Sequence, residues 1–189
     1  MKGGHHPGTG MGMGGMASPL VLLAALLVGC THNPTTTGAD TDYAGLFGAG
    51  NAAAYATEAP PGSAAEAMTK GDLALAKGDT DRALYEYIRS LNARGDQADA
   101  FYKIGAIHAA RGNDAVAEIA YRRALAVDPG LAPAQTGLGI LLTRKRDYAE
   151  AEAHLRAALR TDPKLAGAHN ALGVLADVQG EHDRAQMHF

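Results

Sequence analysis

The chain has 189 residues and a formal net charge of −3, from 17 Lys and Arg against 20 Asp and Glu. This balance argues against a nucleic-acid-binding protein, which presents a basic face, so we expect no nucleic-acid partner. The single cysteine excludes an internal disulfide and a thiolate zinc cluster.

The N-terminal segment is typical of a secretion signal. Residues 18–28, SPLVLLAALLV, form an apolar run that is too short to span a bilayer, which takes about 20 residues, but long enough for the core of a signal peptide. The run leads into residues 27–30, LVGC, which resemble the lipobox of bacterial lipoproteins. The resemblance implies that residues 1–29 are removed as a lipoprotein signal peptide, and that Cys30 bears a lipid anchor which attaches the protein to a membrane.

Two features leave alternatives open at this end of the chain. The stretch before the apolar run has one formal positive charge, Lys2, and an ordinary cleaved signal followed by an unused thiol is the alternative to lipidation of Cys30. Later methionines are alternative starts: Met11, Met13 and Met16. Thr31 is not the Asp that retains enteric-type lipoproteins in the inner membrane, so the resemblance implies the outer membrane, facing the periplasm.

The lipidated cysteine is followed by a segment without periodicity. Residues 30–63 are rich in Thr, Gly, Ala and Pro, a composition that predicts a flexible tether holding the rest of the chain on the order of 30 Å from the membrane. A short docking helix over residues 43–56 is the alternative. It would use four apolar side chains: Tyr43, Leu46, Phe47 and Tyr55.

The remainder of the chain repeats every 34 residues. Glycine occupies the eighth position of every unit: Gly71, Gly105, Gly139 and Gly173. The twenty-fourth position is large: Tyr87, Tyr121, Leu155 and Phe189. A fixed period of this length is the signature of a repeat architecture. Two antiparallel helices approach closely only where a small residue faces a large one. Each unit is therefore predicted to fold as a helix, a short turn and a second helix.

The residues between these helices support the same interpretation. Three glycines are placed to end first helices: Gly78, Gly112 and Gly180. Three polar residues follow these turns and are predicted to cap the next helix with their side chains: Asp79, Asn113 and Asp147. Pro129 and Pro163 follow second helices, which they cannot continue.

Residues 98–130, ADAFYKIGAIHAARGNDAVAEIAYRRALAVDPG, hold the small, aromatic, Ala-Leu and Pro positions of the tetratricopeptide repeat (TPR) family in register. The resemblance covers residues 64–189 and implies an all-α fold, a right-handed superhelix of antiparallel helix pairs, or α-solenoid. The implied units are 64–97, 98–131, 132–165 and 166–189. The first is weak, with Lys70 at a usual Leu position, and the last is incomplete, so we expect the natural protein to continue past Phe189. An uncapped end would leave Leu172 and Leu175 partly exposed. A plain helical bundle is the alternative.

The TPR resemblance also implies a binding surface. Members of the family bind peptides along a concave groove lined by fixed positions of each first helix. Carried over to this chain, the groove residues are Met68, Asp72, Leu75, Tyr102, Ala106, Ala109, Thr136, Ile140, Thr143, Arg144, Asn170, Val174 and Asp177. Chaperone-binding TPR domains hold the terminal carboxylate of a peptide with Lys and Asn side chains at these positions. In the first unit of this chain the corresponding residue is Met68, so we expect no such carboxylate clamp. We therefore predict an apolar peptide or helix as the partner; for Ala106, Ala109 and Val174, packing within the superhelix is the alternative.

Catalytic chemistry has no signature in this sequence. It contains no H-E-x-x-H zinc motif and no G-x-x-x-x-G-K-[ST] phosphate loop. The basic clusters at 122–123 and 144–146 are more typical of solvated helix faces than of binding sites. We predict a non-enzymatic protein without metal, cofactor or small-molecule substrate.

Residues 168–189, AHNALGVLADVQGEHDRAQMHF, resemble the TadD family, the assembly lipoproteins of the tight-adherence (Flp) pilus. The resemblance implies a protein–protein interaction scaffold at the outer membrane that assists assembly of the pilus apparatus and its secretin. One alternative is a pilotin lipoprotein of a type IV pilus, and another is a general envelope TPR adaptor that recruits peptidoglycan enzymes or other periplasmic enzymes. A third class is an enzyme with a catalytic domain beyond Phe189.

Overall fold

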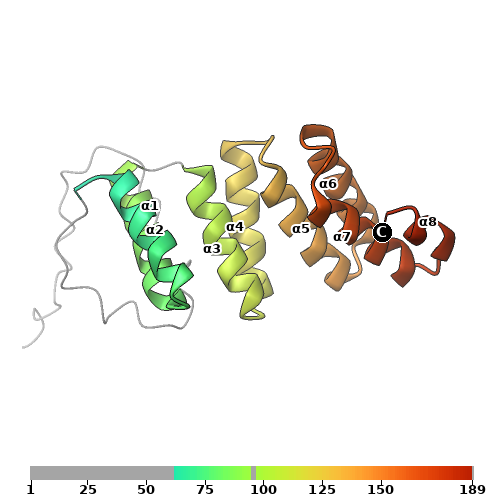
Figure 1. The fold of residues 1–189 in the computed structure, drawn as a ribbon, viewed down its shortest axis with the longest axis horizontal. Coiled ribbons are helices and arrows are strands. Elements are labelled where there is room, and N and C mark those ends of the chain that lie inside the picture. Colours follow the sequence, from blue (N-terminus) through green and yellow to red (C-terminus); the bar gives the residue numbers. More distant parts are fainter. Residues whose placement is uncertain (1–61, 95–96, 189) are drawn as a thin grey trace, which may run out of the picture. The chain divides into compact units, whose positions relative to one another are not determined.

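The computed structural model describes residues 62–94 and 97–188, in which the regular secondary structure is entirely helical (Figure 1). The predicted signal peptide, Cys30 and the tether up to residue 61 lie outside the described residues, as does Phe189. No helix within residues 62–94 and 97–188 is long and apolar enough to cross a membrane.

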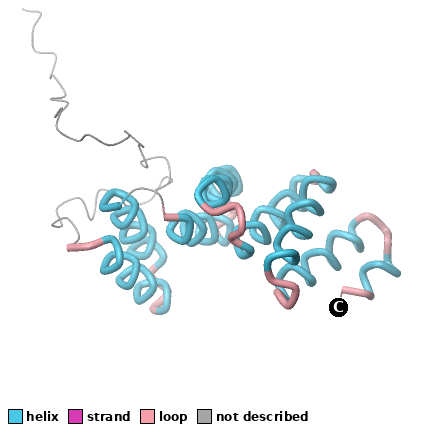
Figure 2. The backbone as a smooth tube through the Cα atoms, turned by 90° about the horizontal axis from the view of Figure 1, so that it is seen from above, coloured by secondary structure: helices cyan, strands magenta, loops and turns pink. Residues whose placement is uncertain are grey.

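The described helices follow one another along the chain, each joined to the next by a short connection (Figure 2). They are α1 (Ala64–Ala76), α2 (Thr80–Arg94), α3 (Ala98–Ala110), α4 (Asp114–Val127), α5 (Ala132–Lys145), α6 (Tyr148–Thr161), α7 (Ala166–Val178) and α8 (His182–Gln186). They pack as antiparallel pairs, α1 with α2, α3 with α4, α5 with α6, and α7 with α8 (Figure 1). The predicted all-α solenoid of helix pairs is confirmed.

Close contact between the two helices of a pair depends on the glycine at the eighth position. A Cβ atom added to Gly71 would lie 2.5 Å from Cε1 of Tyr87, and one added to Gly139 would lie 2.6 Å from Cγ of Leu155. Such distances are far inside van der Waals contact, so only glycine permits the large side chain to pack against the helix backbone. The predicted pairing of small with large residues is confirmed at these positions.

Each first helix ends in the same hydrogen-bonded turn. In the first unit Gly78 has a φ of 78°, its N–H donates to the carbonyl of Leu75 over 2.9 Å, and the N–H of Asp79 donates to that of Ala74 over 3.0 Å. Gly112 and Gly180 also have positive φ, of 75° and 79°, so the three predicted helix-ending glycines are confirmed.

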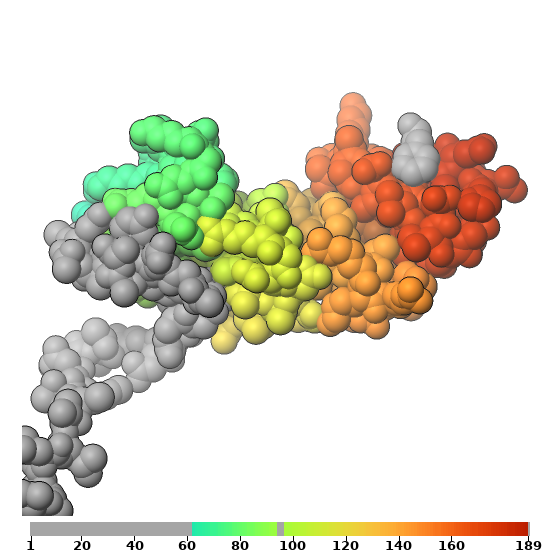
Figure 3. Space-filling model, turned by 90° about the horizontal axis from the view of Figure 1, so that it is seen from below, coloured from blue at the N-terminus to red at the C-terminus, as the bar shows by residue number. Residues whose placement is uncertain are grey.

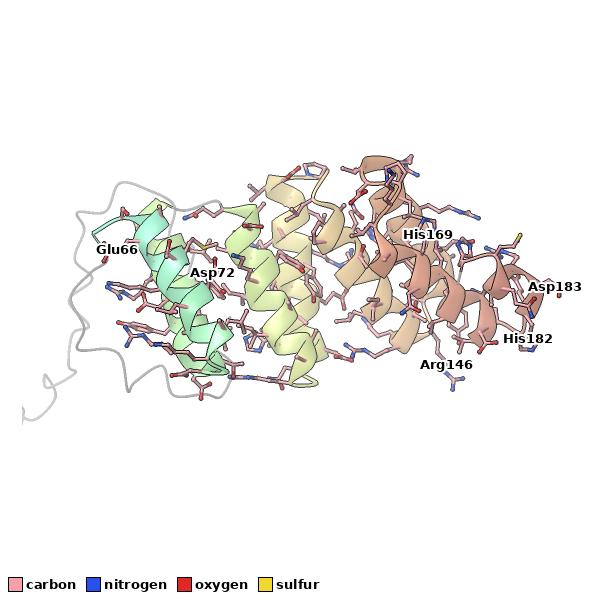
Figure 4. The ribbon with its side chains drawn as sticks, viewed as in Figure 1. Glu66, Asp72, Arg146, His169, His182 and Asp183 are labelled. Atoms are coloured by element: carbon pink, nitrogen blue, oxygen red, sulfur yellow. The ribbon has the colours of Figure 1, made fainter. Side chains whose placement is uncertain are left out.

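The third unit makes this turn without glycine. Arg146 has a φ of 68°, and its N–H donates to the carbonyl of Thr143 over 3.1 Å, as the glycines do in the other units. Its side chain extends away from the helices (Figure 4). A left-handed conformation costs a residue with a Cβ about 1–2 kcal/mol, so this turn is strained relative to the other three.

The side-chain caps of the second helices were predicted only in part. Asp79 does cap α2, because its Oδ1 accepts the N–H of Arg82 over 2.9 Å. The prediction is wrong for Asn113 and Asp147, whose side chains make no capping hydrogen bond. Both have ψ near 62°, outside the extended region from which an N-cap side chain folds over the first turn.

The buried core runs through the helix pairs and reaches the last unit. Leu172 and Leu175 are only 4% and 2% exposed, so the expectation that they are partly bare is wrong. They face back toward the preceding unit and join a cluster with Leu155 and Leu138, instead of facing the end of the stack.

Gly139→Ala should lower the free energy of unfolding by about 1–3 kcal/mol, because its new methyl group overlaps Leu155. The matched control is Gly167→Ala, where a Cβ would lie 3.8 Å from Cγ2 of Thr136. That change should raise the free energy of unfolding by about 0.5–1 kcal/mol, since alanine favours a helix over glycine. Urea unfolding followed by far-UV circular dichroism measures both. Equal stability of Gly139→Ala and the wild type would contradict the packing account.

Candidate peptide-binding surface

The first helices of the units form the inner side of the stack. The first helix α5 packs against both neighbouring first helices, α3 and α7, whereas the second helices α2, α4 and α6 lie farther from one another. Within this helical unit, Figure 3 shows the outline hollowed between the residues of the first pair and those of the last two pairs. A concave surface lined by first helices is the usual binding face of a solenoid.

The predicted groove residues differ in how much surface they present. Seven are exposed: Asp72, Leu75, Ile140, Arg144, Asn170, Val174 and Asp177. Five are half-buried: Met68, Tyr102, Ala106, Ala109 and Thr143. Thr136 is only 8% exposed, and its hydroxyl donates to the carbonyl of Ala132 over 2.9 Å, so it offers a partner almost nothing. Binding by the other residues stays a prediction.

Exposed aliphatic side chains recur along the first helices. Leu75 on α1, Ile140 on α5 and Val174 on α7 are 40%, 42% and 47% exposed. Two more were missed in the sequence, Leu73 on α1 and Val178 on α7, both more than half exposed. Val178 is at the thirteenth position of its unit, the same position as Arg144, and that equivalence could have identified it.

Asp72 is held by neighbouring helices and is not a free acid of the groove. Tyr87 on α2 donates its hydroxyl to Oδ1 of Asp72 over 2.8 Å, and Nζ of Lys103 on α3 lies 2.6 Å from the same oxygen. Partial burial raises the pKa of Asp72, but the hydrogen bonds from Lys103 and Tyr87 outweigh it and leave that pKa below its ordinary value. The carboxylate, labelled in Figure 4, thereby joins the first two units.

Three residues of the basic clusters, Arg122, Arg144 and Lys145, pair with carboxylates of adjoining helices. Nη2 of Arg144 lies 2.7 Å from Oδ1 of Asp114 on α4, and Nζ of Lys145 lies 2.8 Å from Oε2 of Glu118. Arg122 on α4 reaches Glu150 on α6 over 2.9 Å. Exposed pairs of this kind contribute little to stability, so their main effect is to compensate the charges of these three side chains.

Two tyrosines meet at the middle of this surface. The ring centroids of Tyr102 on α3 and Tyr121 on α4 are 6.3 Å apart. The ring of Tyr121 packs against two glycines, because a Cβ on Gly105 or on Gly137 would lie 2.8 Å or 2.6 Å from it. Burial raises the pKa of Tyr121 to about 12, so its hydroxyl stays protonated, and able to donate a hydrogen bond, throughout the physiological range.

The acidic and histidine side chains of the described residues are dispersed over the helices. Within these residues, no group of three or more His, Cys, Asp or Glu side chains comes together as a metal ion requires. His108 is fully buried beside the end of α3, where its Nδ1 lies 3.4 Å from Nδ2 of Asn113.

The profile of the tetratricopeptide repeat family matches residues 68–132 and 136–185. The chain therefore belongs to the tetratricopeptide repeat family, whose repeats in general are non-catalytic scaffolds for protein–protein interaction. No curated protein matches the sequence.

Solved structures show the same fold. MamA is 19% identical, with a TM-score of 0.60, over 67% of this chain and 74% of its own. YrrB, described as a TPR protein with an unusual peptide-binding site, is 21% identical with a TM-score of 0.56, over 66% of this chain and 64% of its own. PilF of Pseudomonas aeruginosa is 22% identical with a TM-score of 0.60, over 66% of this chain and 57% of its own. At these identities the likeness concerns the fold alone.

Proposed function

We propose that the protein is a lipid-anchored scaffold whose first helices bind an apolar peptide or helix of a protein partner. The observation that supports this most strongly is the recurrence of exposed aliphatic side chains at groove positions: Leu75, Ile140, Val174 and Val178. Single exposed aliphatic residues are ordinary, but their recurrence on the inner helices of a solenoid favours an interaction surface. YrrB, which has the same fold, is described as having a peptide-binding site.

The energetics favour a partner with an apolar stripe. Full burial of a Val, Leu or Ile side chain contributes about 1.5–3 kcal/mol, so covering side chains that are about half exposed contributes about 1 kcal/mol each. The neighbouring cations are already paired, as Arg144 is with Asp114, and so they do not select a highly acidic segment. Leucine- or isoleucine-rich helices of a partner match this surface best.

The anchor places this surface at a membrane. Residues 27–30, LVGC, support lipidation of Cys30, and Thr31 supports the outer membrane, with the repeats facing the periplasm. The similarity of residues 168–189 to the TadD family supports a role in assembling the tight-adherence (Flp) pilus and its secretin. A secretin or another pilus assembly component is then the partner.

A general envelope adaptor is the second candidate. It is favoured by the chemistry of the surface, because exposed aliphatic side chains such as Ile140 and Val174 accept many apolar helices and define no single sequence. Peptidoglycan enzymes or other periplasmic enzymes would then be the recruited partners.

The double change Ile140→Glu with Val174→Glu should reduce partner recovery at least tenfold, because a charged carboxylate cannot be buried against an apolar helix without a large cost. The measurement is recovery of envelope proteins on the purified lipidated protein, identified by mass spectrometry. Secretin subunits support the pilus role, and murein hydrolases support the adaptor role.

The matched control for this experiment is Ile119→Glu. Ile119 is 55% exposed on α4, a second helix, and so its change adds a charge outside the proposed surface. The control should recover partners as the wild type does. Equal loss in both variants, or none in the double variant, would contradict binding by the first helices.

Cys30→Ser should abolish lipidation, because a hydroxyl cannot replace the thiol that accepts the diacylglycerol. The variant should appear in the soluble periplasmic fraction or remain as the unprocessed precursor, as fractionation and gel mobility show. Retention in the membrane with unchanged mobility would rule out the lipid anchor.

A further inference from the structure

The first two units have a tyrosine at the same repeat position, in different surroundings. Tyr87 and Tyr121 both occupy the twenty-fourth position, and each packs against the glycine of its unit, Gly71 or Gly105. The two hydroxyls are therefore directed toward equivalent places on the first-helix side.

In the first unit the hydroxyl binds a carboxylate of the chain itself. Tyr87 donates to Oδ1 of Asp72 over 2.8 Å, and Lys103 reaches the same oxygen over 2.6 Å. Asp72 is at the ninth position of its unit, and Lys103 is at the sixth position of the next. The tyrosine hydroxyl, the carboxylate and the cation thus form a hydrogen-bonded group of three, in which each member has a partner within the chain.

In the second unit both partners of the tyrosine are replaced. Ala106 stands in the place of Asp72, and Gly137 stands in the place of Lys103. Within the described residues, Tyr121 makes no hydrogen bond through its hydroxyl, and neither does the neighbouring Tyr102. The hydroxyl of Tyr121 is not sealed off from water, so it is available to donate to an acceptor from outside the chain.

Gly137 makes the place accessible. A Cβ on Gly137 would lie 2.6 Å from Cζ of Tyr121 and 2.9 Å from its hydroxyl oxygen, so any side chain there would cover the hydroxyl. Gly137 is itself partly exposed on α5, and the half-buried Ala106 adds only a methyl group. The hydroxyl therefore lies close to the surface between α3 and α5.

We propose that Tyr121 and Tyr102 form a subsite that binds the carboxylate of an Asp or Glu side chain in the bound peptide. This carboxylate takes the place that Asp72 occupies in the first unit. The inference rests on the proposed function, because it concerns one residue of the apolar segment that the first helices bind.

The charges nearby favour a carboxylate over a neutral acceptor. Arg144 on α5 is close enough for its charge to act on Tyr121, although one of its nitrogens is already paired with Asp114. It contributes positive potential near Tyr121. Ile140 and Val174 continue the surface with aliphatic side chains, so the partner is an apolar segment with a single acidic residue.

The test begins with a random twelve-residue phage-displayed peptide library selected on the wild-type protein. The selected peptides should combine aliphatic residues with one Asp or Glu. A synthetic peptide from this set and its Asn or Gln counterpart are then titrated by fluorescence anisotropy. Tyr121→Phe should weaken the acidic peptide about tenfold, since a hydrogen bond to a charged group contributes about 1.5 kcal/mol or more, and should barely affect the amide peptide.

Two further variants keep the result interpretable. Tyr148→Phe removes a tyrosine hydroxyl on α6, outside the proposed subsite, and should bind both peptides as the wild type does. Ala106→Asp supplies the chain's own carboxylate, as in the first unit, and should reduce binding of the acidic peptide in particular. It tests the subsite even if Tyr121→Phe fails to fold, which circular dichroism would reveal.

Selected peptides without an acidic residue, or equal effects of Tyr121→Phe on the acidic and amide peptides, would overturn the subsite. If such peptides still lose binding to Ile140→Glu with Val174→Glu, the proposed apolar surface stands without it. If no peptide is selected, or none responds to that double variant, both the subsite and the apolar surface are overturned.

Discussion

The distance between the two helices of a unit depends on a glycine that faces a large side chain. Gly71 and Gly139 have no room for a Cβ, because the ring of Tyr87 and the side chain of Leu155 lie against their backbones. The same contact occurs at Gly71, Gly105 and Gly139, which stand 34 residues apart, so the first three units pair their helices in the same way. The inner surface of first helices follows from this repetition.

The same contact also determines where polar groups reach the inner surface. A tyrosine packed on its glycine presents its hydroxyl at the first-helix side, as the bond from Tyr87 to Asp72 shows. Between the units, ion pairs such as Arg144 with Asp114 compensate charge on the flanks. What stays available is aliphatic surface, Ile140 and Val174 among it, together with the hydroxyls of Tyr102 and Tyr121. That combination is the basis of the proposed partner chemistry.

The fold was predictable because it depends on a period, which needs only residue size and spacing. The helix-ending glycines, Gly78 among them, were predictable for the same local reason. Arg146 was missed because an arginine does not by itself indicate a left-handed conformation, although its place 34 residues after Gly112 could have identified it. The burial of Thr136 and the pairing of Asp72 with Lys103 depend on contacts between units, which a positional rule taken from one helix does not contain.

Binding by the first helices is the central claim, and methyl NMR tests it most directly. The protein, labelled at its Ile, Leu and Val methyl groups, would be titrated with a peptide that was selected for binding to it. The account predicts shifts at Leu75, Ile140, Val174 and Val178, which lie on first helices, with Ile119 and Val127 on α4 unchanged. Shifts confined to Ile119 and Val127 would contradict it and would place binding on the second helices.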